Sequence, residues 1–196
     1  MWLKFLFDRL LSLLSLLVLW PFMALIALVV FIAMPDGSPF FIQTRIGRGG
    51  KPFKVVKFRT MRVDPADSRP VPGIIKLFRR FKIDELPQLW NVLTGRMSFV
   101  GPRPDIPGYA DRLQGGDREM LLLRPGITGP ASLKYRDEER LLASVPYPKK
   151  YNDEVIWPDK VRLNRYYLHH FSVLTDIRLI IATVFRLHIK YAGEII

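Results

Sequence analysis

The feature that most constrains the fold of this chain is a stretch of 26 residues without a charged side chain, between Arg9 and Asp36. As a single helix it would be about 39 Å long, which exceeds the roughly 30 Å of hydrocarbon in a bilayer. It is too long for the apolar part of a cleavable signal peptide, and no small-residue cleavage motif follows it. The N-terminus is therefore predicted to lie in a membrane.

Two further observations concern how this segment sits in the membrane. Pro21 lies close to the middle of the run, where a proline removes a helical hydrogen bond and kinks the helix. Basic residues flank both ends, among them Arg9 before the run and Lys57 after it. Because positive residues favour the cytoplasmic side, both ends are expected there. We therefore favour a re-entrant helix broken at Pro21 over residues 1–36, with residues 37–196 as a cytoplasmic domain, and keep a straight span as the alternative.

The overall charge indicates the kind of partner. The chain of 196 residues has 30 Lys and Arg against 18 Asp and Glu, a net charge of +12. Such an excess points to an anionic partner: nucleic acid, an anionic membrane surface or a phosphorylated substrate. The cations are scattered among glycine–proline turns without a recognisable nucleic-acid-binding module, which argues against nucleic acid. The absence of cysteine excludes disulfides and thiolate metal sites, and the three histidines show no ligand spacing.

After the apolar run the pattern changes to short strands and helices. Residues 40–45 and 53–58, each bounded by turns, are predicted to form a hairpin, and 62–73 a loop. Residues 74–82 mix apolar and basic side chains as a helix in the membrane interface does, although a helix packed on a protein core looks the same. A last helix is expected from about 173 to 191. These elements predict an α+β, mostly helical fold.

Two adjacent carboxylates, Asp84 and Glu85, open a segment with apolar residues at helical spacing. Asp84 suits the N-cap of this helix, where the helix dipole and free amides favour an ionised carboxylate. Taken alone, an Asp–Glu pair is ordinary capping. Arg103 follows on a stiff Gly–Pro–Arg–Pro turn, and an acidic pair with a rigid arginine is what phosphoryl chemistry over a divalent cation requires.

Three more cations are candidates for phosphate binding. Lys57 and Arg59 share one face of the second predicted strand, an arrangement that suits a diphosphate, with a solvated sheet edge as the alternative. Arg124 stands in a glycine-rich turn whose backbone N–H groups are able to approach an anion. Such a turn is by itself a weak signal.

Three segments, KFRTM (57–61), DELPQLWNVLTGRMSFVGPRP (84–104) and RPGITG (124–129), together resemble the monotopic phosphoglycosyl transferases, the bacterial sugar transferase family. The resemblance extends over nearly the whole chain. It implies transfer of a phosphosugar from a nucleotide diphosphate sugar, usually a UDP-sugar, to a polyprenyl phosphate such as undecaprenyl phosphate. This would be the first membrane step of glycoconjugate assembly, at the cytoplasmic face of the bacterial inner membrane. The implied mechanism is ping-pong through a covalent aspartyl-phosphosugar.

The resemblance also implies roles for individual residues. Asp84 matches the nucleophile, and Glu85 its partner in a dyad that binds Mg2+. Lys57, Arg103 and Arg124 match basic positions that clamp phosphates. Two alternatives stay open: a non-catalytic scaffold of the same family, and a phosphohydrolase that passes the same aspartyl intermediate to water.

Overall fold

A computed structural model describes residues 2–62 and 71–196, so most of the loop expected over 62–73 lies outside the described residues. Helices predominate. They are α1 (Trp2–Ala33), α2 (Gly73–Arg80), α3 (Gln88–Leu93), α4 (Pro130–Lys134), α5 (Glu138–Ala143), α6 (Pro148–Tyr151), α7 (Trp157–His170) and α8 (Val173–Val184). The strands are β1 (Phe40–Ile46), β2 (Pro52–Phe58), β3 (Ser98–Val100), β4 (Gly126–Thr128), β5 (Lys190–Tyr191) and β6 (Glu194–Ile195). Short 3-10 turns cover Arg48–Gly50, Ile83–Glu85, Ala110–Arg112 and Gly115–Leu122, and a π-helical turn covers Asn152–Ile156.

Within the described residues the strands pair as small two-stranded sheets. β1 and β2 are antiparallel, with Phe40 opposite Phe58, which confirms the predicted hairpin. β3 and β4 are parallel, and β5 and β6 form a short antiparallel hairpin. The last helix was expected to reach residue 191 but ends at Val184, where Arg186 takes a left-handed conformation with φ of 54°. The chain then turns back into β5 and β6.

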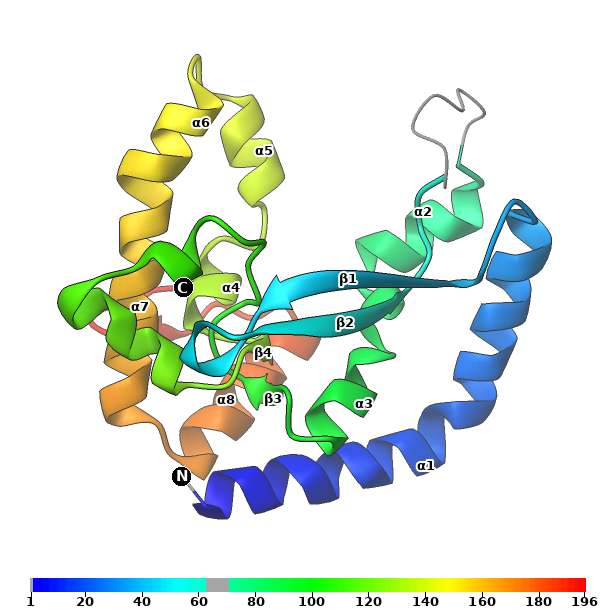
Figure 1. Cartoon of the computed structure of the whole chain (residues 1–196), viewed down its shortest axis with the longest axis horizontal. Coiled ribbons are helices and arrows are strands. Elements are labelled where there is room, and N and C mark those ends of the chain that lie inside the picture. The colour runs from blue at the N-terminus through cyan, green and yellow to red at the C-terminus, as the bar shows by residue number, and fades with distance from the viewer. Residues whose placement is uncertain (1, 63–70) are drawn as a thin grey trace.

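The N-terminal apolar segment forms one continuous helix, α1, with Pro21 inside it. By length and composition, α1 is the one described helix able to cross a membrane. The break expected at Pro21 is therefore a bend and not an interruption. Figure 1 shows the dark-blue half of α1 running beneath the body of the molecule and the second half turning up along its side. A proline has no amide hydrogen to donate to the carbonyl four residues earlier, so the helix bends there. Most apolar side chains of α1 are exposed.

The C-terminal end of α1 packs against the hairpin and α2. Val30 and Met34 are fully buried in a cluster with Phe58, Ile75 and Phe78. The segment predicted as a helix over 74–82 is thus packed on a protein core through one of its faces. The same helix keeps other apolar side chains exposed, namely Ile74, Leu77 and, just after its end, Phe81.

A second core lies where β3 meets α4, α7 and α8. Its buried members are Val100, Leu123, Leu133, Tyr167, Leu168, Leu179, Ala182, Tyr191 and Ile196. This core supports the two loops that follow β3 and precede β4, which carry Arg103 and Arg124.

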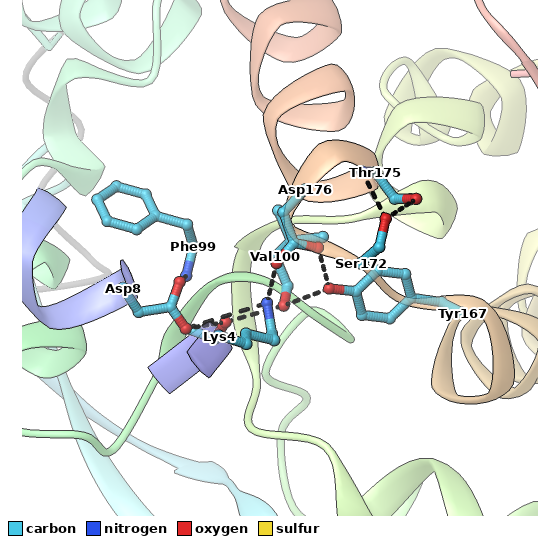
Figure 2. Close-up of polar contacts among 9 residues, drawn as sticks. Lys4, Asp8, Phe99, Val100, Tyr167, Ser172, Thr175 and Asp176 are labelled. Carbon is cyan, nitrogen blue, oxygen red and sulfur yellow. Dashed lines mark hydrogen bonds and ion pairs between the residues drawn. The ribbon is translucent and has the colours of Figure 1, made fainter. Parts of the chain in front are cut away.

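A buried polar network joins the N-terminal end of α1 to this second core (Figure 2). Lys4 Nζ donates to Asp176 Oδ2 in α8 at 2.5 Å, and the Tyr167 hydroxyl in α7 donates to the other oxygen of Asp176. One turn on in α1, Asp8 accepts a hydrogen bond of 2.7 Å from the Ser98 hydroxyl in β3. Both ends of α1 therefore contact the same folded body.

Candidate active site

The two adjacent carboxylates lie in the 3-10 turn Ile83–Glu85 that precedes α3, and both are buried. The prediction that Asp84 caps the helix is wrong, because α3 begins at Gln88 with Pro87 at the capping position. The turn is set by Lys82, whose left-handed backbone (φ of 56°) reverses the chain after α2. This geometry presents Asp84 and Glu85 toward β2 and the loop after β3.

Glu85 is held by two cations from different parts of the chain. Its Oε1 accepts from Lys57 Nζ in β2 at 3.0 Å and from Arg103 Nη2 at 2.8 Å. Burial alone would raise the pKa of Glu85, but Arg103 and Lys57 outweigh it and bring that pKa down to about 2. Glu85 is therefore ionised at every physiological pH. The structure thus brings Lys57 and Arg103, both predicted as phosphate-binding residues, onto Glu85.

The pKa of Asp84 is shifted in the opposite direction. Burial, and then the neighbouring charge of Glu85, raise the pKa of Asp84 to about 6, although Lys57 and Arg103 offset part of that rise. The two adjacent carboxyl groups thus have pKa values far apart. Such a separation is typical of acid–base or nucleophilic pairs, because one group is fixed as a charge and the other stays adjustable.

A small pocket opens beside the pair. It is lined by Arg45, Val55, Lys57, Glu85, Gln88, Arg103, Pro104 and Gly126. Arg45 and Gln88 were not predicted as site residues. Arg45 reaches the pocket because its guanidinium donates to the Pro104 carbonyl at 3.3 Å, and β1 carries it there. The predicted hairpin pairs the strand that carries Arg45 with the strand that carries Lys57. This pairing was the signal in the sequence that could have placed Arg45 near the site.

A third carboxylate lies next to this pocket and was also missed. Burial raises the pKa of Asp105 to about 6, with Lys160, Arg45 and Arg103 near enough to lower it in part. The main chain of Asp105 is tied to β1, since the Ile46 amide donates to its carbonyl oxygen at 2.9 Å. Asp105 follows Arg103 by two residues, so the acidic side chain could have been found by extending the Gly–Pro–Arg–Pro motif.

Two predicted phosphate-binding residues lie elsewhere. Arg59 comes just after β2 ends and is buried at the C-terminal end of α1, where it donates to Asp36 Oδ2 and to the Gly37 carbonyl, both at 3.2 Å. It does not project with Lys57. The reason is that the strand alternation stops at Phe58, so Arg59 leaves the face that the strand pattern assigned to it.

Arg124 is also apart from the carboxylates. Its guanidinium stacks on the Phe5 ring of α1, with Cζ 3.7 Å from the ring centroid. Its turn nevertheless supports the site, because Gly126 lines the pocket and the Gly126 amide donates to the Pro102 carbonyl at 2.8 Å. Any Cβ at Gly101 would collide with the Arg124 carbonyl oxygen, so the two turns require a glycine to pack this closely.

The residues around the carboxyl pair include few possible ligands for a magnesium ion. In the described residues no group of three or more His, Asp or Glu side chains is placed to enclose a metal. Mg2+ commonly uses only one or two carboxylates and completes its shell with water and substrate phosphates. Asp84 and Glu85 are adjacent, and Glu85 lines the cation-lined pocket, so the pair fits a metal shared with a phosphorylated substrate.

Comparison with known proteins gives the lineage. A family model described as "Bacterial sugar transferase" matches residues 1–190. The chain belongs to the bacterial sugar transferase family. Within this family it is 36% identical to the exopolysaccharide production protein PSS of Rhizobium leguminosarum bv. phaseoli, an alignment that covers 93% of each chain.

Longer family members are also similar. The UDP-glucose:undecaprenyl-phosphate glucose-1-phosphate transferase of Escherichia coli is 36% identical over 91% of this chain and 39% of its own length. The enzyme of the same name from Xanthomonas campestris is 34% identical over 93% of this chain and 38% of its own length. The chain thus spans about two fifths of these two relatives and nearly all of the Rhizobium protein.

Proposed function

We propose that this protein is a membrane-bound phosphoglycosyl transferase. It takes a phosphosugar from a UDP-sugar and gives it to a polyprenyl phosphate, undecaprenyl phosphate in bacteria, with release of UMP. The observation that carries the proposal is the difference between the two adjacent carboxyl groups. Glu85 accepts hydrogen bonds from Lys57 and Arg103, whereas Asp84 has a pKa raised to about 6. The names of the relatives supply the substrate classes.

The proposed chemistry proceeds in two displacements at one phosphorus. An ionised Asp84 oxygen attacks the phosphorus that bears the sugar, and the bond to the bridging oxygen breaks, so that UMP leaves with the electron pair. A phosphate oxygen of the polyprenyl phosphate then attacks the same phosphorus and expels the Asp84 carboxylate. A covalent intermediate divides one difficult transfer between two anions into two easier steps.

The neighbouring residues assist by charge and position. Lys57 and Arg103 would neutralise the phosphate oxygens as negative charge shifts to the leaving UMP. Glu85 holds both cations in place, because each donates to its Oε1. At pH 7 most Asp84 is ionised, since its pKa of about 6 lies below that value. Arg45, on the pocket wall, is a further candidate for contact with the diphosphate.

Asp84 and Glu85 would hold Mg2+ together with the substrate phosphates. The ion would supply Lewis-acid stabilisation of the charge that develops on the diphosphate.

The membrane arrangement follows from α1. We propose that residues 1–36 dip into the cytoplasmic leaflet and return, so that residues 37–196 act at the cytoplasmic face of the inner membrane. Both ends of α1 contact the same body, through Lys4 at one end and Val30 at the other, which supports a re-entrant helix over a span. An acceptor phosphate at the leaflet surface would then lie within reach of the pocket.

The decisive experiment incubates the purified full chain in detergent with radiolabelled UDP-sugars and Mg2+, without polyprenyl phosphate. We expect release of UMP together with label retained on the protein, and loss of both in Asp84→Asn. Addition of polyprenyl phosphate should then discharge the label into lipid.

Other outcomes would decide against the proposal. Continuous release of sugar phosphate into water without an acceptor would indicate the phosphohydrolase. Absence of UMP and of label with every UDP-sugar, from a folded protein, would contradict transfer from a UDP-sugar and favour the scaffold.

A further inference from the structure

Three guanidinium groups gather at the N-terminal end of α1, away from the catalytic carboxylates. They belong to Arg9 in α1, Arg48 in the turn between β1 and β2, and Arg124 in the loop before β4. Arg124 and Arg48 both approach the Phe5 ring, with Cζ atoms 3.7 Å and 5.9 Å from the ring centroid. Segments far apart in sequence thus bring three like charges together.

Arg9 reaches the same place across a glycine. A Cβ on Gly95 would lie 2.7 Å from Arg9 Nη2 and 3.5 Å from Arg124 Nη1. Gly95 has a φ of 74°, so its turn favours glycine for conformational reasons as well. The absence of a side chain there leaves room for the two guanidinium groups to converge.

The cluster has no anionic partner of its own in the part of the chain that the structure describes. None of the three guanidinium groups makes an ion pair or a hydrogen bond with a carboxylate there. Asp8 is close enough to influence Arg124 electrostatically, but its oxygens accept from Ser98 and from the Phe99 amide. Burial, with Arg9 and Arg48 next, lowers the pKa of Arg124, and Asp8 offsets part of that change.

The position of the cluster identifies the kind of anion. Arg9 is the last charged residue before the 26-residue apolar run, and cations at such a boundary lie at the level of lipid head groups. Arginine forks match phosphate oxygens in two-point contacts. Arg9 and Arg48 are exposed, and Arg124 is half-buried, so a ligand is able to approach from outside.

We propose that Arg9, Arg48 and Arg124 form a binding site for the phosphate head group of a membrane lipid. The ligand chemistry is a lipid phosphate, either the diester of an anionic phospholipid or the monoester of a polyprenyl phosphate. Gly126, two residues beyond Arg124, lines the catalytic pocket, so the loop before β4 links this site to the pocket. The site does not depend on the proposed transfer reaction, and its occupancy is measurable by binding alone.

The test uses the full chain in an uncharged detergent and measures dissociation constants for defined probes. The phospholipid probe is dihexanoylphosphatidylglycerol, with dihexanoylphosphatidylcholine as its counterpart without net charge. The polyprenyl probe is farnesyl phosphate, with farnesol as its counterpart. Inorganic phosphate is the free-anion probe. The variants are Arg9→Gln/Arg48→Gln and, as a matched loss of two charges at a distant exposed site, Lys149→Gln/Lys150→Gln in α6.

We expect at least one phosphate lipid to bind about tenfold or more weakly to Arg9→Gln/Arg48→Gln than to wild type, because each basic residue near an anionic surface contributes substantially. Lys149→Gln/Lys150→Gln should bind like wild type. Selective loss of dihexanoylphosphatidylglycerol binding would identify a bilayer lipid, and selective loss of farnesyl phosphate binding the acceptor.

Three results would overturn the proposal. These are equal affinities in the two double variants, equal binding of the charged and uncharged counterparts, and inorganic phosphate binding as tightly as either lipid. Because Arg9 and Arg48 are exposed, both variants are expected to fold, and equal melting temperatures would show that a loss of binding is local. Asp84→Asn should keep full binding, so failure of the transfer reaction and failure of this site are distinguishable.

Discussion

Lys4 and Asp176 form a buried ion pair although 172 residues separate them in the chain. The Lys4 side chain is 5% exposed and that of Asp176 is 1% exposed, so neither charge is solvated by water. The Tyr167 hydroxyl satisfies the second oxygen of Asp176. This pair fixes the start of the apolar helix α1 to α8, the helix that closes the second core.

We expect Asp176→Asn to lower the free energy of unfolding by about 3–5 kcal/mol, because the buried Lys4 ammonium loses its closer anion and keeps only Asp8, at 4.0 Å. The paired change Lys4→Met/Asp176→Leu should recover part of this stability, since both charges of the pair are removed together, while the buried Asp8 keeps its hydrogen bonds from Ser98 and the Phe99 amide. The measurement is thermal unfolding in detergent. As a control, Glu139→Gln removes the exposed ion pair with Arg79 and should cost less than about 1 kcal/mol. Equal effects of the two single changes would contradict a special role for the buried pair.

Lys57 and Arg59 are two residues apart and are predicted to respond differently to truncation. Lys57→Ala removes a cation that faces the pocket and should slow formation of the labelled protein about 100-fold, with a smaller loss of stability than Arg59→Ala because Arg103 still pairs with Glu85. Arg59→Ala removes a buried guanidinium that joins β2 to the end of α1, so it should cost about 2–4 kcal/mol of stability. The labelling rate per folded molecule should stay near wild type. A lower labelling rate in Arg59→Ala without loss of stability would contradict this and indicate that Arg59 binds phosphate.

Chelation of divalent cations should stop labelling without unfolding the protein. Glu85 is already held by Lys57 and Arg103, so we expect the fold to persist when a metal is removed. Addition of Mg2+ should restore the rate. The readouts are UMP release and the melting temperature in parallel. A large fall in melting temperature on chelation would instead indicate a structural ion.

Stability should depend on pH through the charges at the C-terminal hairpin. Hydrogen bonds from Lys134 and Arg162 lower the pKa of Glu194, and its ordinary value is 4.5. The stabilisation is therefore complete above about pH 4.5 and is lost as the pH falls through the lower, folded-state value. We expect Glu194→Gln to be less stable than wild type at pH 7, with the difference shrinking toward acid. A difference that is constant with pH would show that the carboxylate charge is not its source.

Several features of this protein could be predicted because they depend on residues close together in the sequence. Helical length and apolar character identify α1, and alternation between turns identifies the β1–β2 hairpin. The carboxyl pair and Arg103 lie within 20 residues, and the stiff proline turn limits where Arg103 is able to go. Lys57 was placed correctly because it belongs to a regular strand, where the direction of each side chain follows from its position.

Other features follow from contacts between distant segments. Arg59 lies outside the strand, so alternation no longer governs it, and its burial depends on the end of α1. Arg124 was grouped with the phosphate clamp, but its position depends on Phe5, more than a hundred residues earlier. Arg45 joined the pocket through the Pro104 carbonyl, a contact with no counterpart in the local pattern.

The sequence by itself determined the long apolar helix at the N-terminus, the mostly helical composition and the motif of adjacent carboxylates with Arg103, because apolar length, periodicity and motif spacing are local properties. Only the tertiary structure decided which cations face the carboxylates, which ones gather at the membrane helix, and that both ends of α1 contact one body. Those outcomes depend on burial and on charge pairing between segments, and the free energy of such contacts exists only once the chain has folded.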